Sequence, residues 1–272
     1  MTPVAAERPD RALAAVSTGA RRRLLDLAAS RGVHLGASLS VIDILVGVYD
    51  LTGFAPDRPS GHRGDRVILS KGHSVWALYS VLAEFGVAGL DDPRAGHPVE
   101  GTPGVTAATG ALGHGLSIGA GLALGARLDG TAQRSVVVLG DGELDEGSVW
   151  EAAMFAAHHR LANLVAVVDR NGLQQEGHTE SILSLEPLDA KWASFGWRVL
   201  EADGHDHAAL RTALRTALDG QDGRPTVVVA RTVKGRGVSL MEGDARYHYV
   251  QLTPEEHAAA TRALVGTGQG AA

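Results

Sequence analysis

Cysteine is absent from this 272-residue sequence, and phenylalanine, tyrosine and tryptophan occur only four times each. Without cysteine there is no disulfide framework, no thiolate metal site and no catalytic thiol. No apolar run is long enough to span a bilayer, and the N-terminus lacks the pattern of a secretion signal. The net charge of −6 gives no polybasic surface for nucleic acid. We therefore expect a cytoplasmic protein that contacts neither nucleic acid nor a membrane.

Glycine, in contrast, occurs 35 times, and the length suits one large α/β domain with a full core. Short β-branched runs that stop at glycine-rich or acidic turns predict strands at 66–69, 136–139, 164–168, 197–202 and 225–230. Helical patterns separate most of these runs, including 10–30, where the basic triplet 21–23 is expected on the solvated side. The predicted class is α/β, with a mostly parallel sheet flanked by helices.

Two of the predicted strands end in turns that carry oxygen ligands. Residues 136–139 stop at Gly140-Asp141-Gly142, and residues 164–168 stop at Asp169-Arg170-Asn171, about thirty positions further on. One helix lies between them, so the strands should be parallel neighbours whose carboxyl ends meet at one edge. A carboxylate and an amide at that edge suit Mg²⁺, which completes its octahedron with water and phosphate oxygens. The sequence thus predicts a metal that joins a phosphorylated ligand to the protein.

The residues around these turns, GDGELDEGSVWEAAMFAAHHRLANL and VDRNGLQ, resemble the thiamine diphosphate enzymes and, more specifically, transketolase. The resemblance implies a thiamine diphosphate-binding fold, with the diphosphate domain over 1–265. Its terminal position predicts that 266–272 form a disordered tail. It implies thiamine diphosphate and Mg²⁺ as cofactors, with Ca²⁺ or Mn²⁺ as alternative ions. The implied metal ligands are Asp141, Asn171 and the main-chain oxygen of Leu173. The resemblance also assigns cofactor contacts to Gly110, Leu112, Gly140, Gly142 and Glu143.

Histidines in glycine-rich turns form a second part of the resemblance. His34 in GVHLGASLS and His97 in the loop 91–110 match family histidines that orient the hydroxyls of a donor ketose. His73 in SKGHSVWALY and His248 in KGRGVSLMEGDARYHY match histidines that contact the diphosphate or the reacting oxygens. The catalytic set implied is His34, His97 and His248, with His73 and His248 as cofactor contacts. Tyr249 stands where the family usually has glycine, and the role of His114, where it usually has glutamine, is left open.

The resemblance covers about 32–248 but only one of the three transketolase domains. It therefore implies an N-terminal subunit that works with a separate chain carrying the pyrimidine domain, in an α2β2 heterotetramer. The implied reaction is transfer of a two-carbon ketol unit between sugar phosphates, and Glu146 matches a glutamate that pairs across the dimer interface. Two alternatives are an enzyme that delivers the unit to a lipoyl carrier protein and a non-catalytic cofactor-binding subunit.

Two further motifs point to unrelated functions. Residues 115–119 form a literal G-x-S-x-G, but a serine nucleophile elbow needs an apolar strand before the serine, and 106–114 is small and glycine-broken. A calcium loop starting at Asp141 would need glycine at its sixth position, where Glu146 stands, and glutamate at its twelfth, where Ala152 stands. A serine hydrolase is the weaker alternative, and an EF-hand is excluded.

Overall fold

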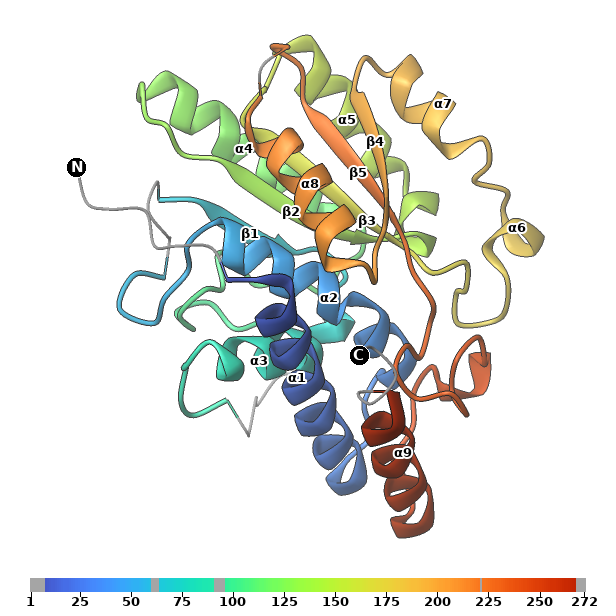
Figure 1. Ribbon diagram of the computed structural model, residues 1–272. Coiled ribbons are helices and arrows are strands. Elements are labelled where there is room, and N and C mark those ends of the chain that lie inside the picture. The colour runs from blue at the N-terminus through green and yellow to red at the C-terminus, as the bar shows by residue number, and fades with distance from the viewer. Residues whose placement is uncertain (1–7, 60–63, 91–95, 221, 268–272) are drawn as a thin grey trace.

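The computed structural model describes residues 8–59, 64–90, 96–220 and 222–267. Its centre is a five-stranded sheet in the order β1-β2-β3-β5-β4, and every neighbouring pair is parallel (Figure 1). The strands are β1 Arg66–Leu69, β2 Ser135–Gly140, β3 Leu164–Arg170, β4 Arg198–Asp203 and β5 Thr226–Arg231. The predicted parallel sheet is confirmed.

Helices cover both faces of the sheet and give the chain three layers (Figure 1). One face packs against α1 Asp10–Ser30, α2 Leu35–Leu51, α3 Val75–Glu84 and α8 His207–Leu218. The other face packs against α4 His114–Leu128, α5 Gly147–His158 and α7 Leu188–Ser194. The remaining helical elements are α6 Thr179–Ile182, α9 Pro254–Thr267 and the 3₁₀ turns η1 Gly72–Ser74, η2 Gly142–Asp145 and η3 Ala245–Tyr247.

The strands read as continuous apolar runs because both faces of the sheet are buried. In β2, Val136 and Val138 point into the core shared with α2 and α3, whereas Val137 and Leu139 point into the core under α4 and α5. All four are essentially inaccessible to solvent. This burial fixes the register of the strand, because a slip of one residue would exchange the two faces.

Three sequence expectations change in detail. Arg21 is buried rather than solvated, because its guanidinium pairs with Asp43 of α2. The G-x-S-x-G residues predict a small-residue helix from 116, but the helix begins earlier, at His114, so Ser117 lies inside α4 and not on a strand-to-helix turn. This placement excludes the serine hydrolase interpretation. Helix α9 continues to Thr267, so 266–267 are helical rather than part of a disordered tail; 268–272 lie outside the described residues.

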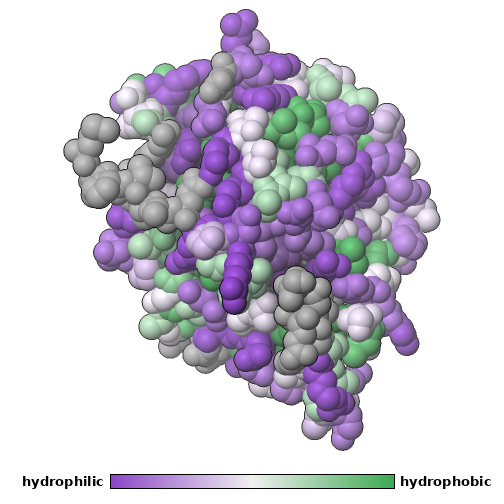
Figure 2. Space-filling model, viewed as in Figure 1, coloured by the Kyte–Doolittle hydropathy of each residue, from purple (hydrophilic) through white to green (hydrophobic). Residues whose placement is uncertain are grey.

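The face of the molecule seen in Figure 2 is mainly hydrophilic, and its apolar residues are scattered or form small groups. In the ranges that the model describes, no helix combines the length and the apolar character needed to cross a membrane.

Candidate active site

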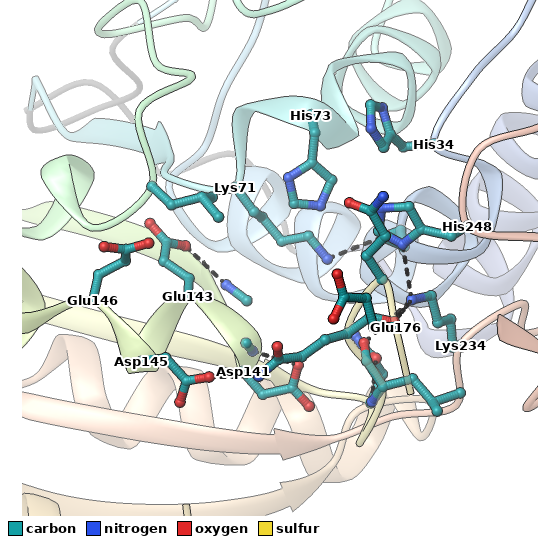
Figure 3. A pocket seen from close by; sticks show the side chains of 18 of the residues that line it. His34, Lys71, His73, Asp141, Glu143, Asp145, Glu146, Glu176, Lys234 and His248 are labelled. Atoms are coloured by element: carbon teal, nitrogen blue, oxygen red, sulfur yellow. Dashed lines mark hydrogen bonds between the residues drawn. The ribbon is translucent and has the colours of Figure 1, made fainter. Parts of the chain in front are cut away.

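A cavity of about 560 Å³ opens at the carboxyl edge of the sheet, beyond the ends of β1, β2 and β3 (Figure 3). The register aligns Gly140 of β2 with Asp169 of β3, so the two ligand-bearing turns that follow lie side by side. Every site residue predicted from the sequence lines this one cavity: His34, His73, His97, Gly110, Leu112, Gly140, Asp141, Gly142, Glu143, Asn171, Leu173 and His248.

The Asp141 carboxylate joins the two turns. The residue is only 2% exposed. Its Oδ1 accepts a hydrogen bond from the backbone N–H of Gly142 at 2.8 Å, and its Oδ2 accepts one from Gly172 at 2.6 Å. The Arg170 guanidinium lies 3.2 Å from the same Oδ2. Burial and the nearby Asp169 carboxylate raise the pKa of Asp141, while Gly172 N–H and Arg170 oppose that rise. A divalent cation bound to the Asp141 carboxylate would lower its pKa and so favour the ionised form.

Asn171 has a defined orientation beside Asp141. Its Nδ2 donates to Asp169 at 3.4 Å, and its Oδ1 accepts from the backbone N–H of Leu173 at 3.2 Å. The main-chain oxygen of Leu173 follows on the same turn and accepts from Lys234 Nζ at 3.2 Å. An amide oxygen and a main-chain oxygen therefore lie on the turn that borders the Asp141 carboxylate.

Two buried lysines in the cavity have no role in the sequence prediction. Lys71 Nζ donates to Asp169 Oδ2 at 2.6 Å and to the Ala37 carbonyl at 3.1 Å. Burial alone would raise the pKa of Asp169, but the Lys71 ammonium holds it below its ordinary value. The second lysine, Lys234, donates to the Gln174 carbonyl at 3.0 Å and lies 3.1 Å from His248 Nδ1. These ammonium groups give the cavity fixed positive charge where an anionic ligand would lie.

Lys234 follows the end of β5 just as Asp141 and Asn171 follow β2 and β3. By sequence, the basic glycine-rich turn over 231–238 suits either a phosphate-binding turn or a mobile loop. Its position at the end of a strand is the signal that could have pointed to Lys234. Burial and the charge of Lys71 lower the pKa of Lys234 to about 8. Its proton is therefore easier to remove than that of a surface lysine.

Three of the predicted histidines, His34, His73 and His248, form a cluster in the cavity close to Lys234 (Figure 3). The ring centroids of His34 and His73 are 5.2 Å apart, and those of His34 and His248 are 5.3 Å apart. Burial and nearby lysines lower the pKa of His73 to about 2 and that of His248 to about 4, and burial with His97 lowers the pKa of His34. All three rings are therefore neutral near pH 7, and each presents one N–H donor and one acceptor nitrogen.

His97 also lines the cavity, and its ring lies against Gly110. A Cβ built on Gly110 would stand 2.9 Å from His97 Cδ2, so only glycine fits without moving the ring. His114 lies outside the cavity, in a neighbouring hollow that it shares with His97 and Gly110. The structure describes the predicted loop 91–110 from residue 96 onward. His97 of this loop lines the cavity, as the resemblance implied.

Glu143 serves as a clamp between three turns. Its carboxylate accepts from the backbone N–H groups of Gly113 at 2.8 Å and Gly140 at 3.1 Å, and from the Ser70 hydroxyl. Burial raises its pKa against the pull of these donors. Glu143 therefore lines the cavity, but its oxygens face protein donors. Glu146, three residues further on, is exposed at the rim of the cavity.

Known proteins place this architecture in a family. The family model described as "Transketolase, thiamine diphosphate binding domain" matches residues 21–269. An apulose-4-phosphate transketolase subunit from Phocaeicola vulgatus is 39% identical over 253 residues, which cover 89% of this chain and 90% of that protein. The 6-deoxy-6-sulfo-D-fructose transketolase subunit SqwG of a Clostridium species is also 39% identical, covering 86% of this chain and 89% of that protein.

Solved structures agree with the sequence relatives. Transketolase from Campylobacter jejuni superposes with a TM-score of 0.82 at 27% identity and covers 93% of this chain, but this chain spans only 42% of that one. The Leishmania mexicana enzyme gives 0.81 at 27% identity, with 91% of this chain and 40% of that one covered. The chain therefore belongs to the transketolase family of transferases, as a subunit-length member that corresponds to the thiamine diphosphate binding domain.

Proposed function

We propose that this chain is the diphosphate-binding subunit of a two-chain transketolase that moves a two-carbon ketol unit from a ketose, or ketose phosphate, to an aldehyde acceptor. The observation that carries the proposal is the meeting, in one cavity, of oxygen ligands, buried ammonium groups and neutral histidines. Relatives of similar length whose names describe single subunits of sugar transketolases support the two-chain arrangement and a sugar substrate.

The donor set fits Mg²⁺ on a diphosphate. We assign Asp141, the Asn171 amide oxygen and the Leu173 main-chain oxygen to the ion, since hard oxygen ligands with open positions for phosphate and water suit it. A structural observation supports this fit: the Lys234 ammonium already donates to the Leu173 oxygen, so that oxygen faces a cation. Ca²⁺ and Mn²⁺ take the same ligand type and are expected to substitute.

The lysines would supply the remaining charge for the diphosphate. Lys71 and Lys234 are each only 1% exposed, so their charges are poorly screened by solvent. Lys71 forms an ion pair with Asp169, which neutralises its charge. Among the described residues of the cavity, Lys234 is therefore the lysine more able to pair with a bound diphosphate. We assign His73 to the diphosphate side, together with Gly110, Leu112, Gly140 and Gly142 as close backbone contacts.

When bound, thiamine diphosphate would supply the electron sink for the cleaved carbon–carbon bond. The chain's own task is to orient substrate hydroxyls and to move protons at them. Because its lowered pKa keeps His34 neutral, that ring can accept a proton from a hydroxyl through one nitrogen while donating through the other. The pKa of His248 is lowered too, and since the Lys234 ammonium donates to its Nδ1, the neutral ring would present its Nε2–H to a reacting oxygen. His97, which lines the same cavity, would also orient the hydroxyls of the donor.

The partner would be a separate chain that carries the pyrimidine domain, in an α2β2 assembly. The rim of the cavity carries the exposed Glu146, which we assign to the contact between the two diphosphate domains. This chain spans about two fifths of the solved one-chain transketolases, so the activity, substrates and partner are proposed for the assembled enzyme.

Mixing the purified chains tests the proposal. With thiamine diphosphate, Mg²⁺, a ketose phosphate and an aldose phosphate, the mixture should transfer a two-carbon unit, and either chain alone should not. Transfer only to a carrier protein whose lipoyl group is in the oxidised, disulfide form would replace the sugar acceptor with a lipoyl one, because the disulfide is reduced as it takes up the two-carbon unit. Turnover by the isolated 272-residue chain would refute the two-chain arrangement, and cofactor binding without turnover in any mixture would favour a non-catalytic role.

A further inference from the structure

The turn at 232–237 decides where Lys234 lies. Its own anchors include a hydrogen bond from the Thr232 hydroxyl to Asp169 and one from the Gly235 N–H to the Gly36 carbonyl at 3.0 Å. Lys234 extends from the middle of this turn into the cavity (Figure 3). A shift of the turn would therefore move the ammonium away from the Leu173 oxygen and from His248.

A histidine outside the cavity also holds this turn. His205 follows β4, and its Nε2 accepts a hydrogen bond from the backbone N–H of Val233 at 2.8 Å. A nitrogen that accepts from an N–H carries no proton, so the proton of the neutral ring is on Nδ1. That Nδ1 lies 2.8 Å from Asp43 Oδ2 and donates to it. His205 is thereby fixed in one tautomer between a carboxylate and the turn.

Asp43 is held in turn by Arg21. The guanidinium contacts both carboxylate oxygens, at 3.0 and 2.5 Å, and the side chains are 8% and 5% exposed. Burial alone would raise the pKa of Asp43, but Arg21 and His205 hold it well below its ordinary value. Arg21 Nε also donates to the Arg236 carbonyl at 3.1 Å, at the far end of the same turn. The network of Arg21, Asp43 and His205 is therefore hydrogen-bonded to the 232–237 turn at two positions, Val233 and Arg236.

We propose that His205, oriented by the Asp43–Arg21 pair, is a positioning residue that sets the Lys234 turn and so the cationic wall of the cofactor cavity. The inference rests on the proposed function for its catalytic consequence, whereas the placement of the turn stands by itself. Without the His205 acceptor, the Val233 N–H loses its partner and the turn loses one of its fixed points. Lys234 then becomes more accessible, and the diphosphate is bound less tightly.

His207 provides a matched control two residues along the chain. Its side chain is 9% exposed, against 6% for His205, and its Nε2 lies 3.6 Å from the other oxygen of Asp43 and 3.3 Å from the Ser17 hydroxyl. None of the hydrogen bonds found for it in the described structure reaches the 232–237 turn. Replacing His207 therefore disturbs Asp43 but spares the Val233 contact.

Two variants separate the two hydrogen bonds of the His205 ring, the one to Asp43 and the one from Val233. In His205→Asn the amide nitrogen can replace the Nδ1 donor to Asp43 but does not reach Val233. In His205→Gln the longer side chain can offer an oxygen to the Val233 N–H. Acetic anhydride labelling of Lys234 in the full-length chain, followed by mass spectrometry with Lys191 as the internal reference, reports accessibility without any requirement for catalysis.

Labelling of Lys234 should be at least about fivefold faster in His205→Asn than in the wild-type chain, and close to wild type in His205→Gln and His207→Asn. In the mixed two-chain enzyme, the half-saturating thiamine diphosphate concentration should rise in His205→Asn with a smaller change in kcat. Equal labelling of folded His205→Asn and wild type, or an equal rise in His207→Asn, would overturn the proposal. If His205→Asn does not fold, a His205→Gln chain that labels much faster than wild type overturns it.

The two proposals fail in different ways. If the wild-type mixture proves inactive while His205→Asn still exposes Lys234, the proposed function is wrong and the positioning role stands. If the mixture is active and neither Lys234 labelling nor cofactor saturation responds to His205→Asn, the positioning role is wrong and the function stands.

Discussion

Lys234 Nζ lies 3.2 Å from the main-chain oxygen of Leu173, on the turn that also carries Asn171. A lysine from the end of β5 thus reaches the turn that follows β3, where one of the oxygens proposed to bind the metal lies. The ammonium and a divalent ion would share this part of the cavity, so binding of metal diphosphate should draw the lysine toward the phosphate oxygens. The relationship places Lys234 within reach of both the proposed metal and His248.

Replacing Lys234 with methionine should weaken cofactor binding. A hydrogen bond from a buried charged group contributes roughly 1.5–3 kcal/mol, which corresponds to about a 10- to 150-fold loss of affinity. Titration of the mixed chains with thiamine diphosphate, followed by tryptophan fluorescence, measures the loss. Lys191→Met on α7 is the control, since its ammonium contacts only the Ser184 carbonyl among the contacts described. Equal affinities in the two variants would remove Lys234 from the site.

Glu143→Gln should destabilise the chain. The carboxylate accepts from two backbone N–H groups and the Ser70 hydroxyl, and a glutamine amide would turn an N–H₂ toward at least one of these donors. A buried donor left without an acceptor costs about 1–3 kcal/mol. Urea unfolding, compared with that of the exposed Glu151→Gln variant, checks this value. An unchanged urea midpoint in Glu143→Gln would show that these hydrogen bonds to the Glu143 carboxylate do not stabilise the fold.

The stability of the fold should fall on mild acidification. His73 has a pKa of about 2 in the fold and an ordinary value of 6.5, so the unfolded chain binds a proton that the folded chain does not. The contribution of the neutral His73 ring to the free energy of unfolding is therefore fully present above about pH 6.5 and is lost progressively as the pH falls below that value. For His73 alone, the loss between pH 6.5 and 5.5 is about 1 kcal/mol.

Denaturant unfolding at the two pH values measures this loss in the wild type and in His73→Gln. The variant should lose less stability than the wild type over the same interval. His158→Gln, at an exposed position of α5, should keep the wild-type dependence. Identical pH dependence in His73→Gln and the wild type would show that His73 is not buried as a neutral ring.

Tyr249 packs its ring against His34, with centroids 4.9 Å apart, and is otherwise 61% exposed. Its hydroxyl lies 2.6 Å from where a Cβ on Gly32 would stand, so the ring and that glycine fit together. Tyr249→Gly should free the His34 ring and raise KM for the donor several-fold. Tyr249→Phe keeps the ring and should behave as wild type. Initial-rate kinetics decides, and an equal KM in all three proteins would exclude a role for the ring.

The edge of the sheet was predictable because the signals are local. The β-branched runs stop at Asp141 and Asn171, and parallel strands bring their carboxyl ends together, so the neighbouring turns followed from sequence. The histidines required the family resemblance, since spacing alone does not show that His34 and His248, far apart in the chain, share a cluster.

The buried charges were not predictable from local pattern. The sequence places Arg21 in a basic triplet on an amphipathic helix, and only packing of α1 on α2 reveals its partner Asp43. Lys71 escapes prediction for the same reason, because its partner Asp169 lies almost a hundred positions further on. Long-range ion pairs of this kind depend on the tertiary structure, which amphipathic periodicity does not encode.

The most direct test of the central claim is the Mg²⁺ dependence of thiamine diphosphate binding to the mixed chains, compared in wild type, Asp141→Asn and the surface control Asp189→Asn. The assignment predicts that Asp141→Asn needs at least about tenfold more Mg²⁺ for half-saturation, while Asp189→Asn matches wild type. Cofactor binding that is independent of Mg²⁺, or unchanged Mg²⁺ dependence in Asp141→Asn, would contradict the claim that this cavity holds a metal diphosphate.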